Sequence, residues 1–135
     1  MSSIIRNAIP QRGNSANKSD LEGILDLQSR NLLINLDPAE LAGGFVMTPF
    51  TTDLLSQLLC QSGVFVAERE GTIVGYVLAA DWEFFSQWEI FRVMISRLPE
   101  LRFQDRKITI NNSFQYGPVC IDRSVAVKFF HNYSI

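Results

Sequence analysis

The segment between residues 64 and 78 constrains the fold most, because two short apolar runs flank a turn sequence in it. A valine-rich run begins at Val64, and a second apolar run begins at Ile73 and ends at Leu78. Glu70 and Gly71 stand between the two runs. β-branched residues favour strands, and an acidic residue followed by glycine is typical of a tight hairpin turn. The segment therefore predicts an antiparallel β-hairpin.

A strand and a helix are predicted before this hairpin. The apolar residues within 4–9 are closed by Pro10 and predict a short edge strand. Ser19 and Glu22 have the spacing of a capping box, in which each residue satisfies the other's backbone N–H. Apolar residues follow at helical spacing, so a first amphipathic helix is predicted to run to about Leu33.

A short helical turn and a second helix are predicted next. Residues 37–44 begin with a helix-start signal that is followed at once by two glycines. Because glycine ends helices, this element is predicted to be only a short helical turn. Thr51 or Thr52 can cap the second helix, whose leucines form one apolar stripe that stops at Gly63.

A third helix and a fourth strand are predicted after the hairpin. Asp81 offers an N-cap to an aromatic stripe at helical spacing that closes at Pro99. The charged residues 102–113 predict a surface loop, and Val119 to Ile121 predict a short strand. This order of elements indicates an α+β domain with helices packed on a mostly antiparallel sheet.

Composition excludes several classes of function. Of the 135 residues, 47% are hydrophobic and 19% are charged, which is typical of a globular domain. The net charge of -2 provides no electrostatic attraction for nucleic acid or an anionic membrane. Residues 1–15 lack the apolar stretch of a secretory signal, and no apolar run reaches membrane-spanning length, so we expect a cytoplasmic protein. Cys60, Cys120 and His131 lack the spacing of a metal site.

The order of the elements and the amino-acid sequences of the central strands resemble those of one family. The sequence VFVAEREGTIVGYVLAADW from Val64 to Trp82 is similar to the second and third strands of the GNAT (GCN5-related) N-acetyltransferases, and GPVCIDRSV from Gly117 to Val125 looks like their fourth strand. The resemblance covers about residues 3–125 of one domain, 1–135, and leaves 126–135 as a divergent tail. It implies a three-layer α/β/α fold around a mixed, mostly antiparallel sheet.

The resemblance also implies a reaction and its participants. Members of the family transfer an acetyl group from acetyl-CoA, their co-substrate, directly to a primary amine, which here would be a small amine acceptor. Such a site needs a pyrophosphate cradle, backbone donors aimed at the thioester oxygen, and a base for the ammonium proton. By resemblance the backbone donors are Val119, Cys120 and Ile121, and the candidates for the base are Asp122, Glu68 and Tyr116.

The pyrophosphate cradle departs from the family pattern. In the family a Q/R-x-x-G-x-G/A loop follows the fourth strand, and its glycines let backbone amides approach the phosphates. Here no glycine follows Gly117, and Ala126 stands where the family's arginine would open the loop. A single Lys128 is a poor substitute. We therefore expect a GNAT-like chain that is incomplete at its C-terminus, with acetyl-CoA binding and activity lost or weakened.

Each candidate residue also has a structural interpretation. An aspartate such as Asp122 that ends a strand commonly makes a turn, and a cysteine between apolar neighbours, such as Cys120, is commonly a buried free thiol. Tyr116 could shape an acceptor pocket. It is equally explained as the residue before a Gly-Pro pair, which is common where a turn leads into a strand. Catalytic and structural roles thus stay open for these residues.

A non-catalytic function is the alternative. A fourth strand followed only by a short tail leaves a sheet edge and apolar surface uncovered, and such edges are templates for other chains. We therefore expect a homodimer with Val119, Ile121 and residues 125–135 at its centre. A weaker alternative is that a partner chain supplies the missing half of the domain.

Overall fold

The computed structural model describes residues 3–10 and 19–125 of the chain. These residues form two compact units, of which the first comprises the described parts of Met1–Leu78 and Pro118–Ile135, and the second comprises Ala79–Gly117. The expectations for Lys128, His131 and the tail 126–135 lie outside the described residues.

The predicted hairpin is confirmed and forms the centre of the first unit. Strands β2 (Val64–Arg69) and β3 (Thr72–Ala80) pair antiparallel. The turn between them has positive φ at both Glu70 (53°) and Gly71 (79°). Two successive left-handed residues match the right-handed twist of the flanking strands, so the chain reverses within two residues.

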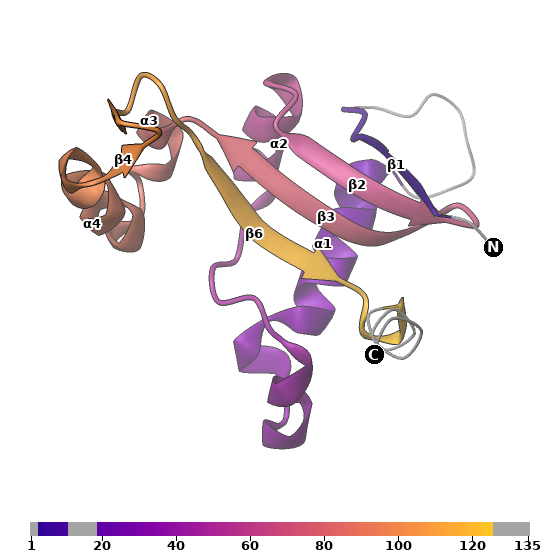
Figure 1. Ribbon diagram of the computed structural model, residues 1–135. Helices are drawn as coiled ribbons and strands as arrows, with labels where there is room; N and C mark the ends of the chain where they lie inside the picture. The colour runs from indigo at the N-terminus through magenta and orange to yellow at the C-terminus, as the bar shows by residue number, and fades with distance from the viewer. Residues whose placement is uncertain (1–2, 11–18, 126–135) are drawn as a thin grey trace. The chain divides into compact units, whose positions relative to one another are not determined.

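The sheet has four strands in the order β1-β2-β3-β6. The predicted edge strand is confirmed as β1 (Ile4–Asn7), which pairs antiparallel with β2. The fourth strand, β6 (Gln115–Ile121), lies beside β3 and runs in the opposite direction (Figure 1). It begins earlier than predicted, and the Asp122 N–H still donates to the Val74 carbonyl at 2.8 Å. The expected α+β class with an antiparallel sheet is therefore confirmed.

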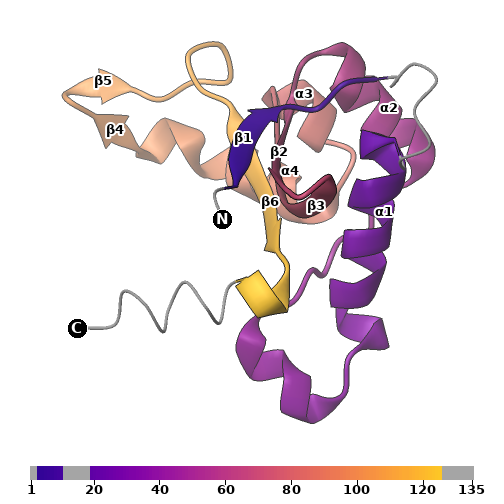
Figure 2. The same ribbon diagram turned by 90° about the vertical axis from the view of Figure 1, so that its right-hand side faces the viewer.

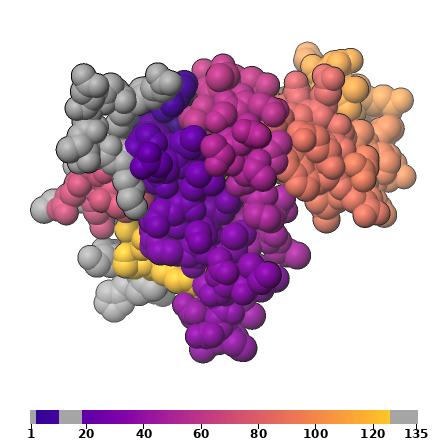
Figure 3. Space-filling view, turned by 180° about the vertical axis from the view of Figure 1, so that it is seen from behind, coloured from indigo at the N-terminus to yellow at the C-terminus, as the bar shows by residue number. Residues whose placement is uncertain are grey.

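Both predicted helices before the hairpin are present. α1 (Asp20–Asn31) begins at the N-cap Ser19, and α2 (Thr52–Cys60) begins at the N-cap Thr51. Figure 2 shows both helices on the same side of the sheet, and Figure 3 shows that side covered mainly by helices, with the end of β6 emerging beside α1. A fully buried aliphatic side chain contributes about 1.5–3 kcal/mol. The core between helices and sheet includes Ile24, Leu27, Leu55, Leu58, Val64, Val66 and Leu78.

The connection between the two helices contains two 3-10 turns. The first, η1, covers Leu33–Asn35, and the second, η2, covers Pro38–Gly43. The second confirms the predicted helical turn, because Asp37 and Glu40 form a reciprocal capping box at its start.

One buried polar side chain fixes the entry to α2. Gln28, on α1, is only 5% exposed. Its amide nitrogen donates to the Phe50 carbonyl at 2.9 Å, and its amide oxygen accepts from the Phe50 N–H at 2.8 Å. One side chain thus satisfies both backbone groups of a buried residue just before the α2 cap.

A glycine sets the distance between α1 and the sheet. A Cβ added to Gly23 would lie 2.7 Å from the Ile73 side chain on β3, which is too close for any real contact. Glycine within a helix costs about 0.5–1 kcal/mol relative to alanine. The close approach of α1 to β3 offsets that cost.

The second unit corrects the prediction of one helix from Asp81 to Pro99. The chain instead forms α3 (Trp82–Phe85), α4 (Glu89–Arg97) and a 3-10 turn, η3 (Leu98–Glu100). The Ser86 hydroxyl donates to the Glu83 carbonyl and the Gln87 amide donates to the Phe84 carbonyl, so these side chains take acceptors that a continuing helix would use. Trp88 is then extended, and α4 starts afresh.

The aromatic side chains of this segment nevertheless pack against one another, and most of them are buried. Phe85 is fully buried and packs against Phe84, Trp88 and Phe91, with ring centroids 4.7–6.0 Å apart. The predicted surface loop 102–113 is exposed, but it contains a small hairpin that the sequence did not indicate. β4 (Arg102–Phe103) pairs with β5 (Arg106–Lys107).

Membrane crossing by a helix finds no support in this architecture. Within residues 3–10 and 19–125, none of the helices combines the length and the apolar character that a bilayer span requires.

Candidate functional site

A cavity of about 250 Å³ lies in the first unit at the end of β6. Its walls come from three segments that are distant in sequence, and they combine apolar side chains with exposed backbone. The lining residues are Asn31 at the end of α1, Gly43, Gly44, Phe45 and Val46 in the connection to α2, and Val119, Cys120 and Ile121 on β6. The three residues that the family resemblance indicates as backbone donors therefore line one cavity.

Two sets of hydrogen bonds hold the wall made by residues 43–46. Val46 forms a short parallel bridge with Leu32, in which the Leu33 N–H donates to Val46 at 2.9 Å and the Val46 N–H donates to Asn31 at 2.8 Å. Arg123, just after β6, fixes the other end of the wall. Its guanidinium donates to the Glu40 carbonyl at 2.5 Å and to the Gly44 carbonyl at 2.8 Å.

Gly43 leaves room for the Arg123 side chain in that clamp. A Cβ on Gly43 would lie 2.6 Å from the Arg123 guanidinium. Sequence analysis interprets Gly43 and Gly44 only as a helix stop. Their contact with Arg123 could not be predicted, because no local pattern links Arg123 to this segment.

The backbone of β6 presents alternate peptide groups to its two sides. The Asp122 N–H donates to Val74 on β3. In an antiparallel ladder the peptide groups of residues two apart face the same neighbour. Cys120 therefore directs its backbone toward β3, whereas Val119 and Ile121 direct theirs away from β3. Of the three predicted backbone donors, two have the orientation that a bound ligand could use.

Asp122, the first candidate for the base, is occupied by structural interactions. One carboxylate oxygen accepts from the Ser124 N–H at 3.0 Å and from its hydroxyl at 2.6 Å, and the other receives Arg30 at 3.0 Å. Partial burial acts to raise the pKa, but the Ser124 hydrogen bonds and the Arg30 ion pair together hold the pKa of Asp122 below its usual value. A lowered pKa makes Asp122 a weak general base for an ammonium proton.

The same contacts explain where β6 ends. Asp122 accepts from Ser124 two residues later in the manner of an N-cap, and residues 123–125 are helical. The part of the family-like segment after Ile121 is therefore not strand.

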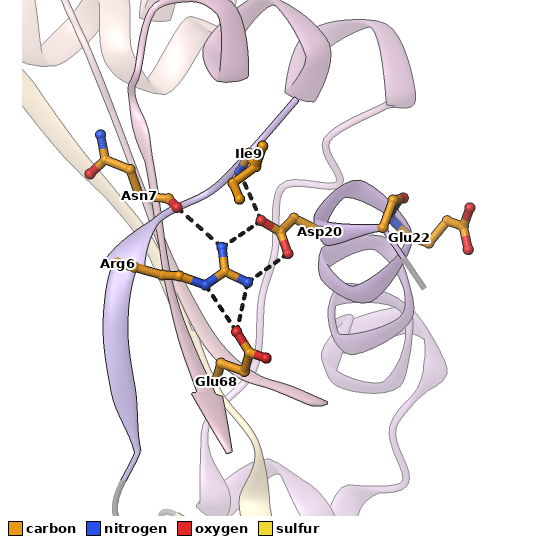
Figure 4. Close-up of polar contacts among 7 residues, drawn as sticks. Arg6, Asn7, Ile9, Asp20, Glu22 and Glu68 are labelled. Carbon is orange, nitrogen blue, oxygen red and sulfur yellow. Dashed lines mark hydrogen bonds and ion pairs between the residues drawn. The ribbon is translucent and has the colours of Figure 1, made fainter. Parts of the chain in front are cut away.

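Glu68, another candidate for the base, belongs to a charge cluster. Arg6 of β1 lies between Glu68 of β2 and Asp20 of α1, at 2.7 Å from Glu68 and 2.6 Å from Asp20 (Figure 4). Asp20 is 1% exposed and also accepts from the Ile9 N–H at 2.7 Å. The cluster ties three elements together, and Glu68 is not among the residues that line the cavity.

Tyr116, the remaining candidate, belongs to the second unit. It lies on β6 and is 67% exposed. The structure brings Val119, Cys120 and Ile121 to one cavity with Asp122 adjoining, whereas Glu68 and Tyr116 are not in the cavity wall.

Cys120 has the buried character that the structural interpretation of its sequence context predicts. Cys120 is 5% exposed, and burial raises the pKa of its thiol above the usual value. Beside it lies Tyr76 of β3, for which sequence analysis predicts no functional role. Burial, followed by the neighbouring Cys120, raises the pKa of Tyr76 well above the ordinary range.

Comparison of the chain with known proteins found no match. No protein-family model matches the chain, and neither a curated protein nor a solved structure matches it significantly. In the described part of the chain, no group of three or more His, Cys, Asp or Glu side chains is arranged to hold a metal ion.

Proposed function

We propose that the chain is a GNAT-like N-acetyltransferase domain of the cytoplasm with lost or weakened activity. The main support is the cavity at the end of the fourth strand, where the peptide groups of Val119 and Ile121 point away from β3. In the family reaction an amine attacks the acetyl carbonyl, the carbon–sulfur bond breaks, and CoA leaves as the thiolate. N–H groups at this edge would stabilise the negative charge that develops on the carbonyl oxygen.

The reduction in activity follows from two other properties. Residues 122–135, where the family pattern would put the pyrophosphate loop, contain no glycine, so backbone amides there would not approach the pyrophosphate closely. Asp122 is held as a charged carboxylate by Arg30 and Ser124, so proton removal from the amine would be inefficient. The acceptor is a primary amine, and a homodimer is the expected assembly.

Acetyl-CoA should bind the 135-residue protein with a dissociation constant weaker than about 100 μM, equivalent to less than about 6 kcal/mol of binding free energy. Isothermal titration calorimetry measures this affinity. Amide NMR spectra at millimolar acetyl-CoA then locate the site, and we expect the largest shifts at Val119 and Ile121. Micromolar binding would contradict the inference that the chain lacks a pyrophosphate cradle. Shifts confined to residues outside the cavity wall would contradict the acetyltransferase proposal.

The second candidate function is self-association through β6. The sheet face opposite the helices leaves Ile5 80%, Val119 52% and Ile121 51% exposed. The edge strand β1 is short and carries the inward-pointing Arg6, which protects edges against pairing, whereas β6 has no charged residue in seven. We propose that β6 of a second copy pairs antiparallel with this strand, in competition with any ligand of the same edge.

Ile121→Asp should convert the dimer to a monomer, because it would place a carboxylate in the apolar surface that the paired strands bury. Light scattering after size-exclusion chromatography gives the mass. Ile34→Asp is the matched control, since Ile34 is 88% exposed on η1 and should leave the dimer intact. A wild-type protein that is monomeric at all concentrations would exclude this assembly.

A further inference from the structure

A second cavity lies within the second unit, at the small hairpin of β4 and β5. Its volume is about 420 Å³, which falls within the usual range for small-molecule sites. Figure 2 shows the two short strands as a hairpin that leads into the loop before β6. The wall residues all lie within 103–113, in this hairpin and in that loop. The cavity is therefore independent of the cavity in the first unit and of the proposed acetyltransferase function.

The wall of this cavity carries positive charge. Arg106 and Lys107 are its charged members, and Asp105 in the same hairpin is not part of the wall. Among the described residues the ion-paired arginines are Arg6 and Arg30, and neither Arg106 nor Lys107 has a carboxylate partner there. Two cations without a counter-charge favour an anionic ligand. A phosphate monoester, with a charge of about -1.5 to -2 at pH 7, matches them better than a singly charged carboxylate.

Apolar side chains belong to the same wall. Phe103 stands directly opposite Arg106 across the hairpin, so the two side chains lie on one face of it. Phe103 is exposed and Ile108 is half-buried. An exposed phenyl ring beside a guanidinium offers flat apolar surface next to a charge. The wall therefore suits a ligand that joins an anionic group to an apolar one.

Hydrogen bonds fix the part of the wall that the loop provides. The Asn112 side chain accepts from the Thr109 N–H at 2.8 Å and donates to the Lys107 carbonyl at 2.9 Å. The Ser113 hydroxyl donates to the Thr109 carbonyl at 2.6 Å and accepts from the indole N–H of Trp82 at 3.0 Å. Trp82 is buried, so it anchors the loop to the core of the second unit. A wall that is already ordered loses less entropy when a ligand binds.

The turn of the hairpin is strained at a residue of the wall. Gln104 and Asp105 both have positive φ, of 50° and 65°. Glycine, asparagine and aspartate tolerate this conformation, whereas glutamine is disfavoured in it. Strained residues cluster at binding sites, and Gln104 lies in the cavity wall. A ligand-binding role accounts for a residue that turn formation alone disfavours.

We propose that the cavity at β4 and β5 binds a phosphate monoester whose phosphate is joined to an apolar group. Arg106 and Lys107 supply the positive charge for the phosphate, and Phe103 and Ile108 provide the surface for the apolar group. A soluble metabolite and the headgroup of phosphatidic acid both present this chemistry. The test therefore includes both sources.

Phenyl phosphate is the soluble probe, and Trp82 is the reporter. Its indole N–H is bonded to Ser113 of the wall, so binding should shift the indole signal in ¹H–¹⁵N NMR spectra of the 135-residue protein. We expect the backbone amides of Arg106 and Lys107 to shift with it, and the dissociation constant to be about 1 mM or tighter. The indole of Trp88, which is not part of the wall, should shift little. Benzoate should bind more weakly than phenyl phosphate.

Variants of exposed residues separate the charges of the wall from the general charge of the hairpin. Arg106→Gln and Lys107→Gln should each weaken binding of phenyl phosphate about tenfold. Arg102→Gln is the matched control, because Arg102 lies on the same hairpin but outside the wall. In about 0.15 M salt it should change the affinity less than about twofold. All three positions are exposed, so the melting temperatures should stay unchanged. Phe103→Ser should weaken phenyl phosphate more than inorganic phosphate.

Cosedimentation with vesicles identifies the source of the phosphate. Vesicles of phosphatidylcholine with phosphatidic acid should retain the protein if the ligand is a lipid, and Arg106→Gln should abolish that retention. Binding of phenyl phosphate without cosedimentation assigns the site to a soluble ligand. Two results would overturn the inference. One is the absence of both phenyl phosphate shifts and cosedimentation, and the other is an equal loss of affinity in Arg106→Gln and Arg102→Gln.

Discussion

Replacing Arg6 with methionine is expected to lower the free energy of unfolding by about 3 to 5 kcal/mol. Arg6 is the partner of Asp20, which is 1% exposed, and it also separates that carboxylate from Glu68. Methionine keeps the apolar stem but leaves a buried negative charge with a second one nearby. Urea denaturation followed by far-UV circular dichroism measures the loss.

Arg30→Met is the matched control for that experiment. Arg30 also bridges two carboxylates, Asp26 and Asp122, but its side chain is 49% exposed. Exposed pairs contribute only about 0–1 kcal/mol, because water screens them and side-chain entropy opposes them. If the two variants were destabilised equally, burial of Asp20 would not be the cause of the effect.

Replacing Gln28 with alanine should cost about 2 to 5 kcal/mol. The Gln28 amide serves both the N–H and the C=O of Phe50, which is 2% exposed, and each buried group that loses its partner costs about 1–3 kcal/mol. The same change also detaches α1 from the start of α2. Denaturation curves compared with those of the wild type provide the measurement.

Gln28→Glu distinguishes the two hydrogen bonds. A carboxylate can still accept from the Phe50 N–H, but when ionised it cannot donate to the Phe50 carbonyl. This variant should regain stability as the pH falls and the acid becomes protonated, since the protonated form again provides a donor. Equal stability of the glutamate and glutamine proteins at neutral pH would show that the bond to the carbonyl contributes nothing.

The elements that could be predicted from the sequence are those with local determinants. Ser19 and Thr51 cap their helices through atoms three residues away, and the Glu70–Gly71 turn needs only its own two residues. The break at Ser86 and Gln87 was missed because apolar periodicity continues across it. There the side chains compete with the backbone for the same carbonyls, and a hydrophobic pattern does not register that competition.

The candidate site was less accessible to prediction, because its contacts are long-range. The resemblance singled out the backbone of Val119, Cys120 and Ile121, and their role as donors stays a prediction. The clamp from Arg123 to Gly44 spans 79 positions, and no local pattern in either segment indicates it. Tyr76 has the sequence context of an ordinary strand residue. Only the structure shows that its hydroxyl is buried beside Cys120.

The absence of a side chain at Gly23 has a consequence for how sequences of this kind can diverge. α1 is a rigid rod, and about 12 Å separate Gly23 from Asn31 along its axis. Any larger residue at position 23 must lift the helix from β3, and that displacement is carried to the cavity wall at Asn31. A residue larger than glycine at position 23 would therefore alter the cavity wall at Asn31 as well as the contact with Ile73.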